Sequence, residues 1–296
     1  MNWFTFLPGA VTVTLAVVLG ARPLPLHPVW SARLLATVAV TTAVAVAGTV
    51  VFVGVNYLAG LAPGLTTWLP EWALFGDDRP LPAPVGVPAL VLAAAGAAVV
   101  WRLLARWTAD VRAARADARR PLDTDAPIAL AVPGRGGGVA VSRGLLAMLG
   151  PEELRVVFEH ERSHLRHRHH RYLAAGALAA AVLPPLRPLD ARLRFAVERW
   201  ADEEAAETVG DRALVARTIA RVALTAPSAA YGSPYGRPFA GLGGSGVVQR
   251  VQALLGEPPP KNAVSGPLVV LTAGCVMSLL ASTALQLDQA LGITLL

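Results

Sequence analysis

Four apolar runs constrain the fold of this chain more than any other feature. They cover about residues 3–21, 34–61, 85–104 and 268–287, and each contains at most one charged residue. A helix of about 20 apolar residues is long enough to cross a bilayer. With 54% hydrophobic and 16% charged residues, the composition differs from that of an ordinary soluble domain. We therefore expect an integral membrane protein with about four transmembrane helices.

The apolar runs divide the sequence into three parts. Residues 1–106 are expected to form a membrane domain with three helices, and residues 107–265 a more polar domain. Residues 266–296 are expected to contain a C-terminal transmembrane helix. No basic residue precedes the first run and no clear cleavage site follows it, so we interpret this run as an anchor rather than a signal peptide.

Arginines gather around the end of the third run and at the loop that Arg22 and Arg33 flank. The positive-inside rule places such segments in the cytoplasm. We therefore expect a multi-pass protein of the cell membrane with residues 107–265 on the cytoplasmic side. The net charge of +6 is explained by these arginines, which flank helices expected to lie in a lipid bilayer. We therefore expect no direct nucleic-acid binding. The arginines at the third run are Arg102, Arg106, Arg112, Arg115, Arg119 and Arg120.

The polar part is expected to be mainly helical with one small β-hairpin. Residues 126–132 and 138–142 are strand-like and surround a glycine-rich turn. No Gly-Lys-Ser/Thr follows those glycines, so the sequence indicates nucleotide binding only weakly. Residues 172–183 are apolar but short for a span, and we place them in the core, with membrane contact left open. Further helices are expected over 107–120 (a basic helix leaving the bilayer, or equally a plain connector), 189–210, 211–225 and 247–255.

The segment from His160 to His164 has the pattern His-Glu-x-x-His, and a helix is expected to carry it. Pro151 suits the first helical position. At 3.6 residues per turn, Leu154, Val157, Phe158 and Leu165 form one apolar stripe, and Glu161 falls inside it. Because an unpaired buried carboxylate is costly, Glu161 needs a partner.

Zinc is the partner that this pattern indicates. His160 and His164 lie one helical turn apart, so both can bind one ion, while Glu161 can reach a water beside that ion. The ion lowers the pKa of the water, and Glu161 is expected to act as the general base when the water attacks a peptide carbonyl. The competing interpretation is a charged surface helix that contains the pattern by chance.

A catalytic zinc site usually has three protein ligands. Glu198 and Asp202 share one face of a predicted helix, which makes Glu198 the expected third ligand and Asp202 a partner for the free N–H of a zinc-binding histidine. A solvated acidic patch with Glu203, Glu204 and Glu207 is the alternative. His167 is a rival ligand, about 10 Å along the helix axis from His160. We expect His169 and His170 at the surface.

The pair His160-Glu161-x-x-His164 and Glu198-x-x-Ala201-Asp202 resembles the membrane zinc peptidases of the BlaR/MecR antirepressor type. It is also similar to the HtpX and CAAX prenyl endopeptidase group. The resemblance covers about residues 123–211 in detail and implies a gluzincin, a zincin-like α+β domain whose third zinc ligand is Glu. Three spans before the motif favour the antirepressor type. Sensor-bearing members continue into a penicillin-binding domain after the last span, so we do not expect direct antibiotic sensing by this chain.

Three functions follow from these patterns. The first is a zinc-dependent endopeptidase at the cytoplasmic face. The resemblance to the antirepressor peptidases implies a protein substrate for it, such as a repressor of the BlaI/MecI kind. The second is a quality-control protease that clips membrane proteins. The third is a non-catalytic signalling protein with a structural zinc site, closed by His167 or Asp202 as fourth ligand.

Overall fold

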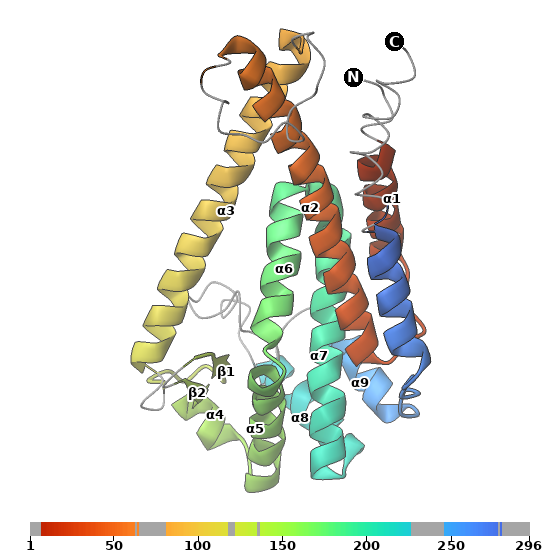
Figure 1. Cartoon of the computed structure of the whole chain (residues 1–296). Coiled ribbons are helices and arrows are strands. Elements are labelled where there is room, and N and C mark those ends of the chain that lie inside the picture. The colour runs from red at the N-terminus through yellow and green to blue at the C-terminus, as the bar shows by residue number, and fades with distance from the viewer. Residues whose placement is uncertain are drawn as a thin grey trace.

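The computed structural model describes residues 7–62, 64, 81–117, 122–134, 137–225, 246–277 and 279. As expected, the described residues are mainly helical and contain one antiparallel sheet of two strands (Figure 1). The elements are α1 (Leu7–Ala21), α2 (Pro28–Leu61), α3 (Ala83–Asp117), β1 (Ala129–Val132), β2 (Gly138–Val141), α4 (Arg143–Met148), α5 (Pro151–Arg166), α6 (His169–Val182), η4 (Pro184–Leu186), α7 (Arg187–Val209), α8 (Arg212–Thr225) and α9 (Val247–Leu255).

Two of the described helices are long and apolar enough to cross a membrane, not the four that we expected. They lie within Pro28–Leu61 and Ala83–Ala113. The first apolar run forms α1, which has 15 residues, and the fourth forms a short apolar helix over Ser265–Met277. Both are shorter than the roughly 20 residues that a span requires. The rest of these two runs, residues 3–6 and residues 278–287 apart from Leu279, lies outside the described residues.

The two long helices extend beyond the apolar runs that predicted them. α2 begins at Pro28, because Nδ1 of His27 accepts a hydrogen bond from the backbone N–H of Val29 at 3.4 Å and proline suits the first helical position. The loop expected to reach Arg33 therefore ends at residue 27. α3 continues past residue 104 without a break, so the basic segment up to Asp117 is part of the same helix.

One apolar core joins the N-terminal helices to α6 and the first half of α7. Its buried members include Leu35 and Val38 from α2, Ala180 from α6 and Leu193 from α7. α6 contacts α2 and α7, and Figure 1 shows it beside them between α3 and α1. The expected core position of residues 172–183 is thus confirmed, while the domain bounds stay a prediction.

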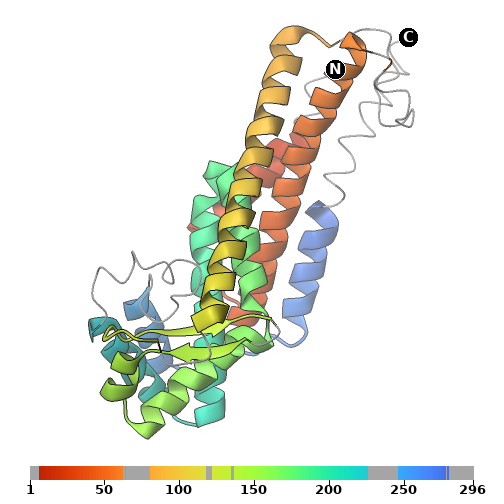
Figure 2. The same cartoon turned by 90° about the vertical axis from the view of Figure 1, so that its left-hand side faces the viewer.

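A second apolar core lies under the hairpin and is formed by α5, α8 and α9 with parts of both strands. β1 and β2 pair in the register Ala129↔Val141 to Val132↔Gly138, inside the two segments that the sequence predicted. Ser142 follows β2 and caps α4, since its Oγ accepts the backbone N–H of Leu145 at 3.1 Å. Seen from the side, the hairpin lies at the lower end of α3 (Figure 2).

Candidate metal centre

α5 presents the His-Glu-x-x-His motif on its buried face. The helix begins at Pro151 as expected, and the side chain of Glu153 accepts the backbone N–H of Gly150 at 3.0 Å. Farther along the same helix, His160 is 1% exposed and Glu161 is 2% exposed. Glu161 therefore lies inside the protein, as its place on the apolar stripe predicted, and a surface helix that contains the motif by chance is excluded.

His160, His164 and Glu198 bring their ligand atoms together, all within 4.8 Å of one another. The Nε2 atoms of the two histidines are 3.2 Å apart. Oε2 of Glu198 lies 3.5 Å from Nε2 of His160, and Oε1 of Glu198 lies 3.7 Å from Nε2 of His164.

These separations fit zinc. Two ligands at about 2.0–2.1 Å from a tetrahedral ion lie roughly 3.3 Å apart. The chemistry of the three groups also suits this ion, since imidazole nitrogens and a carboxylate oxygen are ordinary zinc ligands. No other group of three metal-binding side chains was found among the described residues.

Asp202 and His167, the two candidates for a fourth ligand, face other partners. Oδ1 of Asp202 lies 3.0 Å from Nδ1 of His160, on the side of the ring opposite to the cluster. Nε2 of His167 lies 2.9 Å from Oε2 of Glu204. Within the part of the chain that the structure describes, the cluster therefore offers three protein ligands.

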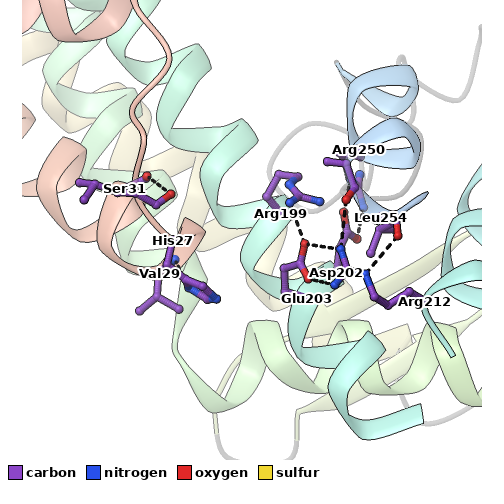
Figure 3. A network of polar contacts seen from close by, with 11 residues as sticks. His27, Val29, Ser31, Arg199, Asp202, Glu203, Arg212, Arg250 and Leu254 are labelled. Carbon is purple, nitrogen blue, oxygen red and sulfur yellow. Dashed lines mark hydrogen bonds and ion pairs between the residues drawn. The ribbon is translucent and has the colours of Figure 1, made fainter. Parts of the chain in front are cut away.

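Arg250 on α9 completes the polar surroundings of the cluster, and our sequence analysis missed it. Its guanidinium is fully buried and grips Asp202 through Nε at 2.7 Å and Nη2 at 2.6 Å (Figure 3). Its Nη1 lies 3.2 Å from Oε2 of Glu198. A signal was present in the sequence, since Arg250 shares the apolar face of a short helix with Val247 and Leu254.

The place that we predicted for His169 is wrong. It is fully buried rather than at the surface, and its Nδ1 lies 3.1 Å from Nδ1 of His164. α5 ends at Arg166, and Arg168 adopts a left-handed conformation with φ of 54° that turns His169 inward at the start of α6. There its ring packs against Trp200, with centroids 4.6 Å apart. His170 is half-buried.

The acidic residues after Asp202 are paired rather than gathered in a solvated patch. Glu203 is buried and forms ion pairs with Arg199 and Arg212, which Figure 3 shows beside Asp202. Glu204 accepts a hydrogen bond from Oγ of Ser163 at 2.6 Å. These contacts fix α7 against α5 and α8, and so fix the distance between Glu198 and the two histidines.

The charges of the cluster depend on one another. Burial lowers the pKa of His160, but hydrogen bonds to Asp202 and Glu198 outweigh burial and raise the pKa to about 9. Burial, together with the charge on His160, lowers the pKa of His164 to about 4 despite the opposing effect of Glu198. Burial raises the pKa of Glu198, yet His164 and Arg250 lower it more, to about 2. Glu198 is therefore an anion at neutral pH, as a zinc ligand must be.

Glu161 has a different environment from Glu198. Burial, and then the nearby charge of Glu198, raise its pKa to about 7, although His160 and a hydrogen bond from the backbone N–H of Ala131 oppose the rise. Its Oε1 is buried without a hydrogen-bond partner. A carboxylate with a free buried oxygen and a pKa near neutrality can accept and return a proton.

Comparison with known proteins agrees with this geometry. Residues 109–186 match the model of Peptidase family M48, a zinc-dependent family. The matched segment includes His160, Glu161 and His164, and Glu198 lies 12 residues beyond it. No curated protein and no solved structure matches the chain. The similarity to family M48 over residues 109–186 and the His160–His164–Glu198 cluster together indicate a zinc metallopeptidase.

Proposed function

We propose that this protein is an integral-membrane endopeptidase whose zinc is held by His160, His164 and Glu198. The observation that carries the proposal is the placement of Glu161, which is buried and has a free oxygen beside a cluster of three ligands. A structural zinc site usually has four protein ligands and needs no base. When bound, zinc polarises the scissile carbonyl and lowers the pKa of the attacking water.

Glu161 acts first as general base and then as general acid. It accepts a proton from the water as the water attacks the carbonyl carbon, and it returns that proton to the leaving amine. A cation held by the adjacent ligands would further stabilise the ionised form of Glu161, so the base is ready at neutral pH. The N–H of Ala131 holds the carboxylate on one side.

Asp202 and Arg250 position the ligands. The charge of Asp202, whose Oδ1 lies 3.0 Å from Nδ1 of His160, favours a proton on that nitrogen, which leaves Nε2 of the ring to bind the ion. Arg250 neutralises Asp202 and also lies beside Glu198, so the two buried carboxylates do not repel each other.

The decisive experiment compares the purified full-length protein with Glu161→Gln. We expect both to contain one zinc ion, and the variant to hydrolyse peptides about 100 to 10,000 times more slowly. Glu159→Gln is the matched control, because Glu159 lies two residues away on the same helix and pairs with Arg162. Equal activity of Glu161→Gln, or wild-type protein without zinc, contradicts the proposal.

The substrate that we propose is a cytoplasmic protein, in particular a repressor of the BlaI/MecI kind. The arginines at the end of α3 support a cytoplasmic active site through the positive-inside rule. Quality control of membrane proteins is the second candidate, favoured by the core that joins α6 and α7 to the long helix α2. Peptides released in cells with wild type and with Glu161→Gln separate the two. Cleavage confined to one DNA-binding protein supports the repressor, and cleavage of many membrane proteins contradicts it.

A further inference from the structure

A cavity of about 780 Å³ lies outside the metal centre, where α3, the turn of the hairpin and the junction of α5 and α6 meet. Neither the three metal ligands nor Glu161 are among the described residues that line this cavity. Ligand pockets typically measure about 300–1,000 Å³. The described lining residues are Trp107, Thr108, Val111, Arg112, Arg115, Val132, Pro133, Gly134, Gly137, Gly138, Leu165, Arg168, His170 and Arg171.

The cavity is strongly cationic. Four arginines from two parts of the chain line it (Arg112 and Arg115 on α3, Arg168 and Arg171 at the start of α6), and its described lining contains no Asp or Glu. Arg115 is held in place, since its Nε and Nη2 donate to the carbonyl of Pro133 at 3.0 Å and 2.8 Å. The other three have no ion pair with any described carboxylate.

The charges act on the interior of the cavity. Burial lowers the pKa of His170, and the positive charges of Arg171 and Arg168 lower it further. Unneutralised guanidinium groups that surround one space repel each other, and an anion in that space relieves the repulsion.

The position of the cavity relates it to the membrane. Trp107, Arg112 and Arg115 belong to the same helix as the candidate span Ala83–Ala113. Tryptophan and arginine at the end of a span are typical of the headgroup region of a bilayer. The ring centroids of Trp107 on α3 and His170 on α6 lie 6.4 Å apart, so two aromatic side chains line the cavity where these helices meet.

We propose that this cavity binds a phosphate group, carried either by the headgroup of an anionic lipid or by a free phosphate compound. Guanidinium groups bind phosphate oxygens in pairs of parallel hydrogen bonds, and several of them around one space match the charge of phosphate better than that of a single carboxylate. A bound lipid would anchor the hairpin, whose strand β1 contacts Glu161, to the membrane surface.

Two pairs of variants of the full-length protein test the proposal. Arg112→Gln/Arg171→Gln removes two charges from the cavity, and Arg106→Gln/Arg187→Gln removes two exposed charges that do not line it. Gly138→Asp places a carboxylate at the cavity without crowding, because a Cβ there meets no atom within 4 Å, and Gly138→Asn is its neutral control. Zinc content shows that each variant is folded.

Binding is measured by native mass spectrometry in detergent with dioctanoyl phosphatidylglycerol, dioctanoyl phosphatidylcholine and inorganic phosphate. We expect phosphatidylglycerol to bind more tightly than phosphatidylcholine. We also expect at least about tenfold weaker binding in the cavity double variant and in Gly138→Asp, and no change in either control. If inorganic phosphate, and not phosphatidylglycerol, binds and is lost only in the cavity variants, the result supports a phosphate site whose ligand is a free phosphate compound. Absence of saturable binding of both, or equal loss in the cavity and control variants, overturns the proposal.

Discussion

Asp202 and His160 meet across the interface of α7 and α5, with Oδ1 of the carboxylate 3.0 Å from Nδ1 of the imidazole. Both side chains are almost completely buried. The same carboxylate is held by Arg250, so it cannot rotate away from the histidine. This contact fixes both the orientation of the His160 ring and the nitrogen that carries its proton, which leaves Nε2 for the metal.

Replacing Asp202 with asparagine should weaken zinc binding. The variant Asp202→Asn keeps the size of the side chain but loses the charge that favours the N–H at Nδ1 of His160, so we expect about 10 to 100 times lower zinc affinity. Competition with a chelator measures this affinity. Asp190→Asn is the control, because Asp190 lies on the same helix and pairs with Arg194 at 2.9 Å. A zinc affinity equal to that of wild type would show that Asp202 serves only to neutralise Arg250.

His169 should support His164 in a similar way. Because their Nδ1 atoms are 3.1 Å apart, one ring donates to the other and fixes its orientation. We expect His169→Ala to lower zinc affinity about tenfold or more. The neighbouring variant His170→Ala should leave zinc affinity unchanged, since His170 faces the cavity beside Trp107. Similar losses in both variants would instead indicate general damage to the start of α6.

Removal of zinc should destabilise the protein. Three ligands from α5 and α7 converge on one point, so an ion bound there connects the two helices. A ligand that binds the folded state alone stabilises it by about 2.7 kcal/mol at 100 times its Kd. We therefore expect a chelator to lower the melting temperature in detergent and added zinc to restore it. The variant His164→Ala should show little response to either treatment, and a full response would place the zinc elsewhere.

The sequence predicted the cluster because its parts are local. His160 and His164 are one turn apart on α5, and Glu198 and Asp202 are one turn apart on α7, so helical periodicity places each pair without knowledge of the fold. Arg250 and His169 depend on tertiary structure. Arg250 reaches Asp202 across 48 residues of sequence, and the inward turn of His169 results from the left-handed backbone at Arg168. The number of spans was overestimated because apolar composition alone does not fix the length of a helix: the described helices of the first and fourth runs, α1 and Ser265–Met277, are shorter than a span requires.

Acid should weaken the start of α5 through Glu153. The backbone N–H of Gly150 and the guanidinium of Arg221 lower the pKa of this carboxyl in the folded protein. The carboxylate therefore contributes stability above the unfolded pKa, and this contribution is lost as the pH falls through the lower folded pKa. We expect Glu153→Gln to destabilise the protein at pH 7 by about 0.2–1 kcal/mol, with a smaller difference from wild type in acid. The melting temperatures of wild type and Glu153→Gln, measured at pH 7 and at successively lower pH, test this expectation. Glu152→Gln is the adjacent control, and an effect of Glu153→Gln that does not change with pH would contradict the assignment.

The packing of α1 on α7 should depend on the absence of a side chain at Gly20. A Cβ at this position would lie 2.6 Å from the backbone nitrogen of Leu189 and 2.9 Å from its Cα. These are backbone atoms at the start of α7, so they cannot move aside as the end of a flexible side chain could. Forcing the two helices apart would open the core that contains Leu189 and Leu193, and we expect Gly20→Ala to cost about 1–3 kcal/mol.

Gly48 on α2 provides the matched control for Gly20. A Cβ there meets no atom within 4 Å, so Gly48→Ala removes the flexibility of a glycine inside a helix without a clash. We expect this variant to be as stable as wild type or about 0.5–1 kcal/mol more stable. Thermal unfolding of both variants in the same detergent compares them directly. Because α7 also carries Glu198 and Asp202, the Gly20→Ala variant should lose zinc at a lower temperature than wild type. If both variants melt together with wild type, α1 does not pack on α7 as closely as the structure places it.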